Sequence, residues 1–152
     1  MEREMFCFQC EQTARGTGCT GRAGVCGKPS ATAKNQDKLT GALIALARAA
    51  EGKTPSDSAR RVMMEGLFTT ITNVSFDDDA IALRVEAARR ERDALVPGCR
   101  GCANACPAAD DYDMELVWNA QEDIRSLKAL ILFGLRGMAA YAYHALMLGR
   151  TD

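Results

Sequence analysis

Apolar residues recur at helical spacing in four stretches of the chain, separated by short polar or glycine-containing joints. The first stretch predicts a helix from Ser30, its expected N-cap, to about Ala50. The second predicts a helix with Thr54 as N-cap and Pro55 at its first position, and its pattern breaks near Asn73. The expected buried faces are Leu39, Ala42, Leu43, Leu46 and Ala50 in the first helix, and Ala59, Val62, Met63, Gly66, Leu67, Thr70 and Ile71 in the second.

Two further helices follow in the second half of the chain. The third begins at the acidic residues 77–79 and runs to about Leu95, with a highly charged surface that is typical of a solvated face. The last and longest helix lies between residues 118 and 148, where Gly134 and Gly137 predict the close approach of a neighbouring backbone. No stretch shows the alternating apolar and polar residues of a β-strand, so the predicted fold class is an all-α helical bundle. The apolar face of the last helix comprises Ile124, Leu127, Ile131, Leu135, Met138, Ala142 and Ala145.

The N-terminal segment has a different pattern from these helices. Its first thirty residues contain four cysteines and five glycines without apolar periodicity, which indicates an irregular loop wrapped around a bound group. We therefore divide the chain into a binding loop, residues 1–29, and a helical bundle, residues 30–152, which together make one domain. A second cysteine-containing loop is expected at residues 97–107.

The charge balance and the cysteine content narrow the classes of function. Lysine and arginine total 19 against 20 acidic residues, which gives no electrostatic footprint for nucleic acid or an anionic membrane. The apolar runs are shorter than the roughly 20 residues of a membrane span, and the N-terminus lacks the pattern of an export signal, so we predict a cytoplasmic protein. Seven cysteines in such a chain favour metal ligation over disulfides. Because His144 is the only histidine, any metal must be held mainly by sulfur.

Cys7, Cys10, Cys19 and Cys26 make up a complete set of four thiolate ligands. An iron–sulfur cluster takes four thiolates and accepts hydrogen bonds from backbone N–H groups, which glycines can bring close. A four-sulfur zinc site is the alternative, but its ligands usually form two short pairs, whereas six residues separate Cys19 from Cys26. The spacing therefore favours an iron–sulfur cluster, and leaves zinc and unligated redox-active thiols as alternatives.

Cys99, Cys102 and Cys106 form a second group, followed by Pro107. They reproduce the last three cysteines and the proline of the bacterial ferredoxin run, with Val96 in place of the first cysteine. We favour inert or zinc-binding thiols here over a second cluster. Cys99 and Cys102 could also form the reactive pair of a thiol-based redox sensor.

Three blocks of sequence resemble the hybrid-cluster proteins, also called prismane proteins or hydroxylamine reductases. The first runs from Met5 to Thr13 and continues in Gly18-Cys19 and in Val25-Cys26-Gly27-Lys28. The second runs from Leu67 to Asp77 and the third from Phe133 to Ala145. The blocks stand in the order expected for the family, so the resemblance covers most of the chain.

The resemblance implies a helical N-terminal domain in which Cys7, Cys10, Cys19 and Cys26 hold a [4Fe–4S] cluster, or a [2Fe–2S] cluster in some members. The eight residues between Cys10 and Cys19 are similar to the members with [4Fe–4S], although the six before Cys26 are less typical of them. The implied role is transfer of electrons from a soluble donor to a separate hybrid iron–sulfur–oxygen cluster. There, family members reduce hydroxylamine to ammonia and, in some cases, nitric oxide to nitrous oxide.

The hybrid cluster takes its ligands from later domains of family enzymes, so no catalytic residue is assigned in this chain. We expect a fragment of a longer reductase, with its catalytic domains or a partner subunit as the electron acceptor, and a free-standing electron carrier as the alternative. A rival function from another class is a zinc-stabilised helical binding module. Whether the chain is an enzyme by itself, and its oligomeric state, stay open.

Overall fold

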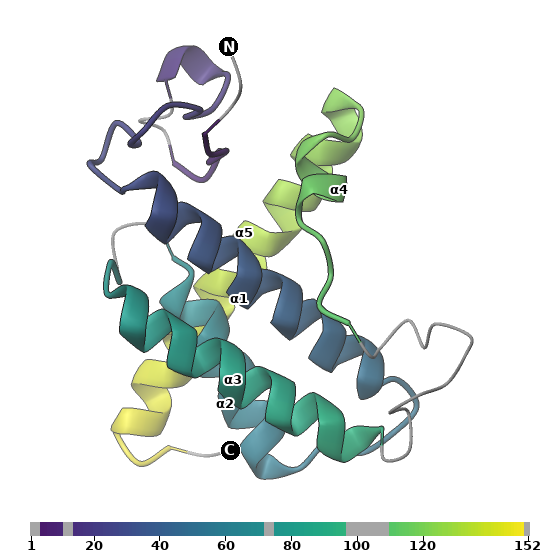
Figure 1. The fold of residues 1–152 in the computed structure, drawn as a ribbon. Helices are drawn as coiled ribbons and strands as arrows, with labels where there is room; N and C mark the ends of the chain where they lie inside the picture. Colours follow the sequence, from purple (N-terminus) through teal and green to yellow (C-terminus); the bar gives the residue numbers. More distant parts are fainter. Residues whose placement is uncertain (1–3, 11–13, 72–74, 97–109, 151–152) are drawn as a thin grey trace.

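A computed structural model of the chain describes residues 4–10, 14–71, 75–96 and 110–150 (Figure 1). Within these ranges the chain forms five α-helices and no β-strand, which confirms the predicted all-α class. The helices are α1 (Ser30–Ala49), α2 (Asp57–Thr69), α3 (Asp78–Leu95), α4 (Glu115–Trp118) and α5 (Glu122–Met147), and a 3-10 turn (Ala14–Gly16) lies in the N-terminal loop.

The first two helices lie where they were predicted, but their N-caps differ. The N-cap of α1 is Pro29, without a side-chain hydrogen bond, and not Ser30. The N-cap of α2 is Ser56, whose hydroxyl accepts a hydrogen bond of 3.0 Å from the Ala59 N–H. Thr54 was therefore the wrong residue, because Ser56 provides an equally good capping hydroxyl two positions closer to the helix.

Helix α3 begins as predicted, with Asp77 as its capping residue. Its charged surface is only partly a solvated face, because three of its arginines, Arg84, Arg89 and Arg92, bind acids from other segments. Arg84 pairs with Glu65 of α2, and Arg92 is buried and donates to Asp111 at 2.9 Å. These ion pairs attach α3 to α2 and to the segment that precedes α4.

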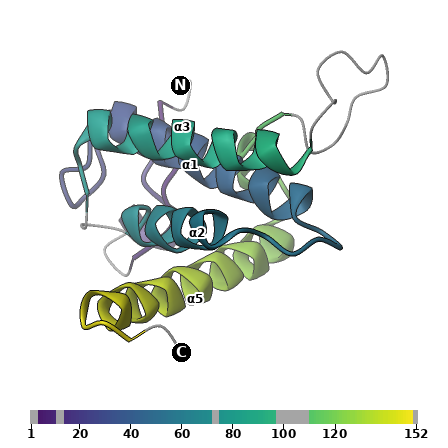
Figure 2. The same cartoon turned by 90° about the horizontal axis from the view of Figure 1, so that it is seen from below.

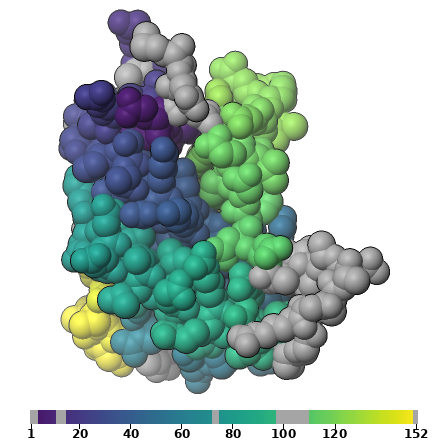
Figure 3. Space-filling view, viewed as in Figure 1, coloured from purple at the N-terminus to yellow at the C-terminus, as the bar shows by residue number. Residues whose placement is uncertain are grey.

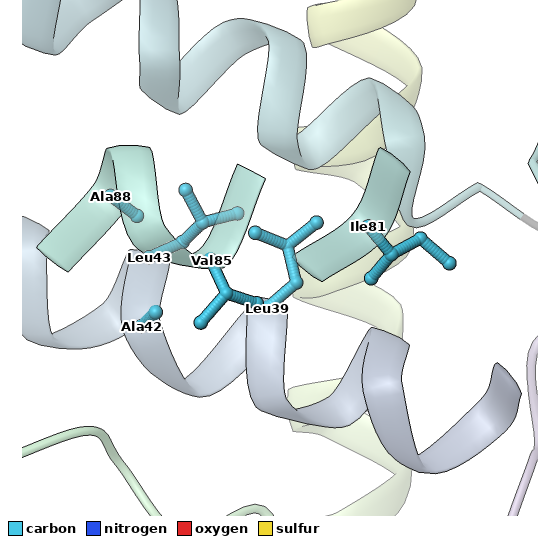
Figure 4. Close-up of a cluster of buried hydrophobic side chains, with 6 residues drawn as sticks. All are labelled: Leu39, Ala42, Leu43, Ile81, Val85 and Ala88. Carbon is cyan, nitrogen blue, oxygen red and sulfur yellow. The ribbon is translucent and has the colours of Figure 1, made fainter. Parts of the chain in front are cut away.

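Helices α1 and α3 lie side by side, and α2 lies against both of them (Figures 1 and 2). Their shared core combines residues of the apolar faces predicted for the first two helices with residues of α3, for which no buried face was predicted. Leu39 and Ile81 are completely buried in it. Figure 4 shows this cluster, which comprises Leu39, Ala42, Leu43, Ile81, Val85 and Ala88. Val62, Met63 and Leu67 of α2 pack against it.

The last predicted helix is two helices, α4 and α5, with a break at residues 119–121. Helix α5 contacts α2 and α4 and forms the outer layer of the bundle (Figure 2). Its buried residues are Arg136 and Ala139, whereas most of the predicted apolar stripe is exposed, Met138 by 70%. No other residue lies close to Gly134 or Gly137, so the predicted close backbone approach is wrong for the described chain.

Among the described helices, α5 alone is long and apolar enough to cross a membrane by length and composition. Core helices of soluble proteins can pass the same test. Arg136, near the middle of α5, is buried and donates hydrogen bonds to Thr70 at 2.8 Å and to Thr40 at 3.1 Å. This arginine fastens α5 to the bundle, since the two hydroxyls belong to α1 and to the end of α2.

Candidate metal centre

The N-terminal loop brings its first and third cysteines together through the backbone. Cys7 and Cys19 form an isolated antiparallel bridge, with N–H to carbonyl hydrogen bonds of 3.0 Å and 2.8 Å. Both cysteines are buried in a small cluster with Met5 and Ala33. Residues twelve positions apart in the sequence are thereby held at adjacent positions by hydrogen bonds that do not depend on their sulfur atoms.

The sulfur atoms of Cys26 and Cys19 both lie close to Gly24. A side-chain carbon at Gly24 would lie 3.5 Å from the Cys26 Sγ and 3.8 Å from the Cys19 Sγ. A turn shapes this part of the loop: the Gly27 N–H donates to the Gly24 carbonyl at 2.9 Å, and Gly27 has a φ of +86°. The positive φ explains glycine at position 27, and the small residue at position 24 leaves the space beside both sulfurs open.

Cys10 is half-buried and lies at the edge of the loop that faces α5. It lines a cavity of about 310 Å³ together with Phe8, Gln9 and, from α5, Ser126, Ala129, Leu130 and Phe133. Cys10 and Cys19 are both close enough to Cys7 to influence its thiol electrostatically. Burial raises the pKa of the Cys7 thiol, the positive charge of Lys28 opposes that rise, and the two neighbouring cysteines add to it.

Lys28 is the largest fully buried side chain near the cysteines, with 1% of its surface exposed. Its ammonium donates to the Gln36 Oε1 at 2.7 Å and lies 3.9 Å from the Cys7 Sγ. The Gln36 amide in turn donates to the Ser75 carbonyl at 3.0 Å, which fixes its orientation. Within the described parts of the chain, no carboxylate pairs with Lys28.

The loop is held on the bundle by aromatic contacts with α4. Phe6 is buried against Trp118, with ring centroids 5.2 Å apart. The guanidinium of Arg125 lies over the Phe6 ring, 5.3 Å from its centroid. Met114 and Val117 complete the apolar contact. Figures 1 and 3 show the loop, in purple, at the start of α1, with the light green region that contains α4 beside it. The cysteines are therefore attached to a packed scaffold.

A buried set of charged residues lies beneath the loop. The Trp118 indole N–H donates to Asp37 at 3.1 Å. Burial raises the pKa of Asp37 to about 7, against the opposing effects of the Trp118 hydrogen bond and of the positive charge on Arg136. Burial also lowers the pKa of Arg136 to about 10. Because this value is still well above 7, the guanidinium is charged at neutral pH.

The shifted pKa of Asp37 predicts a pH-dependent stability. Between about pH 4 and pH 7 the folded chain binds the Asp37 proton more tightly than the unfolded chain, so the free energy of unfolding falls as the pH rises. In Asp37→Asn the amide does not titrate, and its oxygen can still accept from Trp118. We expect urea unfolding at about pH 5 and about pH 8 to show a smaller loss of stability in the variant than in the wild type. Equal losses of stability in the wild type and in Asp37→Asn would contradict the raised pKa of Asp37.

The four thiols of the loop are the donor set that an iron–sulfur cluster takes, and also that of a four-sulfur zinc site. Zinc places four sulfurs about 2.3 Å from one ion, but no three metal-binding side chains among the described residues lie close enough to hold an ion together. A four-iron cluster binds each thiolate through a different iron, so its ligands stand farther apart. The buried Lys28 ammonium calls for anionic charge near it, which four thiolates would supply around a cluster or around a zinc ion.

The structure joins Cys7 to Cys19 through the backbone and brings the Cys19 and Cys26 sulfurs to the same glycine, while the role of the four cysteines as ligands stays a prediction. Cys99, Cys102 and Cys106 lie outside the described residues, so the second predicted site stays a prediction. The pattern of cysteines and apolar residues did not single out Lys28, Asp37 or Arg136. The one available signal was the position of Lys28, two residues after Cys26.

The chain matches the Prismane/CO dehydrogenase family over residues 5–152, and it belongs to that family. It is 39% identical over 163 residues to a hydroxylamine reductase of Maridesulfovibrio salexigens, an alignment that covers 97% of this chain and 30% of the relative. It is 41% identical over 169 residues to a hydroxylamine reductase of Desulfovibrio desulfuricans, which covers 100% of this chain and 31% of the relative. A hydroxylamine reductase of Thermoanaerobacter pseudethanolicus is 39% identical over 168 residues, in an alignment that covers 97% of this chain and 30% of the relative.

The chain therefore spans about a third of the length of the curated relatives that it matches. Proteins of the prismane family carry iron–sulfur clusters, in agreement with the sulfur-based metal chemistry predicted from the cysteines. The relatives also agree with the resemblance seen in the three sequence blocks.

Proposed function

We propose that this chain is the iron–sulfur electron-transfer domain of a hydroxylamine reductase, with Cys7, Cys10, Cys19 and Cys26 as the ligands of one [4Fe–4S] cluster. The observation that carries the proposal is the convergence of these cysteines in one loop on a packed helical scaffold. Residues 1–29 would form the cluster-binding loop and residues 30–152 its supporting bundle. An iron–sulfur cluster, when bound, supplies storage for one electron at a time.

The residues of the chain hold and shield the cluster; none of them needs to transfer a proton. The bridge between Cys7 and Cys19 fixes two ligands in advance, and Gly24 leaves room between the Cys19 and Cys26 sulfurs. Phe6 and Trp118 exclude water from one side of the loop. Such pre-formed ligands and dry surroundings are the means by which a protein tunes the potential of a cluster.

The catalytic site would lie in the remainder of the longer protein or in a partner subunit. Reduction of hydroxylamine to ammonia and water consumes two electrons and two protons, so a domain that delivers single electrons must act twice in each turnover. The exposed apolar face of α5 supports a partner at this side, because Leu130 and Phe133 are exposed beside the Cys10 cavity. A soluble electron donor would supply the electrons, and the protein would be cytoplasmic.

Anaerobic reduction of the isolated chain tests the electron-transfer role. We expect a brown protein whose visible absorbance bleaches on addition of dithionite, with one electron taken up per cluster and a new electron paramagnetic resonance signal. The isolated chain should not reduce hydroxylamine, since it lacks the ligands of a catalytic cluster. A colourless chain with stoichiometric zinc, unchanged by dithionite, would contradict the proposal and leave a zinc-stabilised module.

A further inference from the structure

Lys28 is an unusual residue to find fully buried. An ammonium group loses several kcal/mol of solvation on burial unless opposite charge replaces the water, so buried lysines are normally paired. Within the described residues, the Lys28 ammonium has only two polar neighbours, the neutral Gln36 amide oxygen and the Cys7 sulfur. The only anion that this environment offers in direct contact is therefore a thiolate at position 7.

The position of Lys28 is set by the loop and by α1 together. Its carbonyl accepts a hydrogen bond of 2.8 Å from the Gly24 N–H, and Pro29 directly after it caps α1. Gln36, one and a half turns into that helix, holds the ammonium from the other side. The cation is thus fixed by two elements and points toward the ligand loop, and it is not a flexible surface charge.

A second cation faces the same cysteine from α5. Negative charge at Cys7 would raise the pKa of Arg136, but the hydrogen bonds of Arg136 go to Thr40 and Thr70. Asp37 is the acid that opposes both cations, and it is tied to Trp118. Among these charged groups, Lys28 is the one in contact with a ligand sulfur.

We propose that Lys28 is a potential-tuning residue, whose buried positive charge, held against Cys7 by Gln36, raises the reduction potential of the cluster bound by the four cysteines. The inference rests on the proposed function. A four-iron cluster with four thiolates is anionic, and it gains one further negative charge when a one-electron donor reduces it. A fixed cation stabilises the reduced form more than the oxidised form, and low dielectric surroundings strengthen the effect.

Reduction potentials of four proteins test this role. They are the wild type, Lys28→Met, Lys28→Arg and Lys34→Met, each prepared anaerobically and titrated with dithionite in the presence of redox mediators. Lys34 is exposed on α1, so Lys34→Met removes the same formal charge without touching the loop. Iron and sulfide are measured on every preparation.

We expect Lys28→Met to have a more negative potential than the wild type, with a larger shift than Lys34→Met, and Lys28→Arg to lie near the wild type. Equal shifts in the two methionine variants would overturn the inference, because net charge alone would then explain them. An unchanged potential in an iron-loaded Lys28→Met would overturn it as well. A wild type without iron would instead overturn the proposed function.

Loss of the cluster from Lys28→Met is also informative. If Lys28→Arg keeps its iron while Lys28→Met does not, the positive charge is needed to hold the anionic cluster, which supports the inference. If both variants lose their iron, the shape of the lysine and not its charge matters, and the inference is wrong.

Discussion

Cys19→Ser is expected to lose nearly all of the iron bound by the wild-type chain. Cys19 is central to the loop: its backbone pairs with Cys7, and its sulfur and that of Cys26 both lie beside the open space at Gly24. A serine hydroxyl is a poor ligand for iron–sulfur clusters, which are held by thiolates. Apart from Met5 and Phe6, the described part of the loop buries few apolar side chains other than its cysteines, so loss of the cluster should also loosen the loop. Iron analysis and limited proteolysis measure both effects.

Cys102→Ser is the matched control, with the same substitution in the second group of cysteines. It should keep the iron and sulfide of the wild type, because we favour inert or zinc-binding thiols at that position. A loss of about half of the iron in Cys102→Ser would establish a second cluster site. Unchanged iron in Cys19→Ser would contradict the assignment of the N-terminal ligands.

Gly41→Ala is expected to destabilise the fold by about 3 kcal/mol. A methyl group at position 41 would overlap the backbone carbonyl of Tyr112, which cannot rotate away. The same contact contains a hydrogen bond of 3.1 Å from the Tyr112 N–H to the Gly41 carbonyl. The cost should exceed the roughly 1 kcal/mol that alanine gains over glycine in a helix. Urea unfolding of the two proteins measures the difference.

Gly66→Ala provides the comparison, because it introduces the same methyl group into α2. Its nearest neighbour would be the Leu43 Cδ2 at 2.8 Å, at the end of a side chain that can change its rotamer. We expect Gly66→Ala to stay within about 1 kcal/mol of the wild type. Equal stabilities of the two alanine variants would contradict the prediction, because the segment around Tyr112 could then move away from α1 without cost.

The three-helix core could be predicted in part, because periodicity and burial agree in α1. Leu39 and Leu43 of α1 lie in the core on the face that the pattern predicted, whereas the buried face of α3 with Ile81 was not predicted. The same reasoning was incomplete for α5. Periodicity tells which residues share a face, but not whether another element covers that face, and Leu127 and Met138 are exposed. The break between α4 and α5 was missed because no glycine or proline marks it.

The site, too, could be predicted only in part from the sequence. The spacing of Cys7, Cys10, Cys19 and Cys26 predicted one common loop, within which the structure pairs Cys7 with Cys19 and brings the Cys19 and Cys26 sulfurs near Gly24; their shared ligand role stays a prediction. Lys28 could not be singled out, because lysine is an exposed residue by default and its burial depends on Gln36, eight positions later in α1. Arg136 was hidden for the same reason, since its partners are hydroxyls far away in the sequence.

Iron, acid-labile sulfide and zinc per chain, measured on anaerobically prepared protein, test the central claim that four cysteines of the N-terminal loop hold one iron–sulfur cluster. About four irons and four sulfides per chain, with little zinc, are expected. About one zinc per chain with neither iron nor sulfide, after a preparation that kept oxygen out, would contradict it.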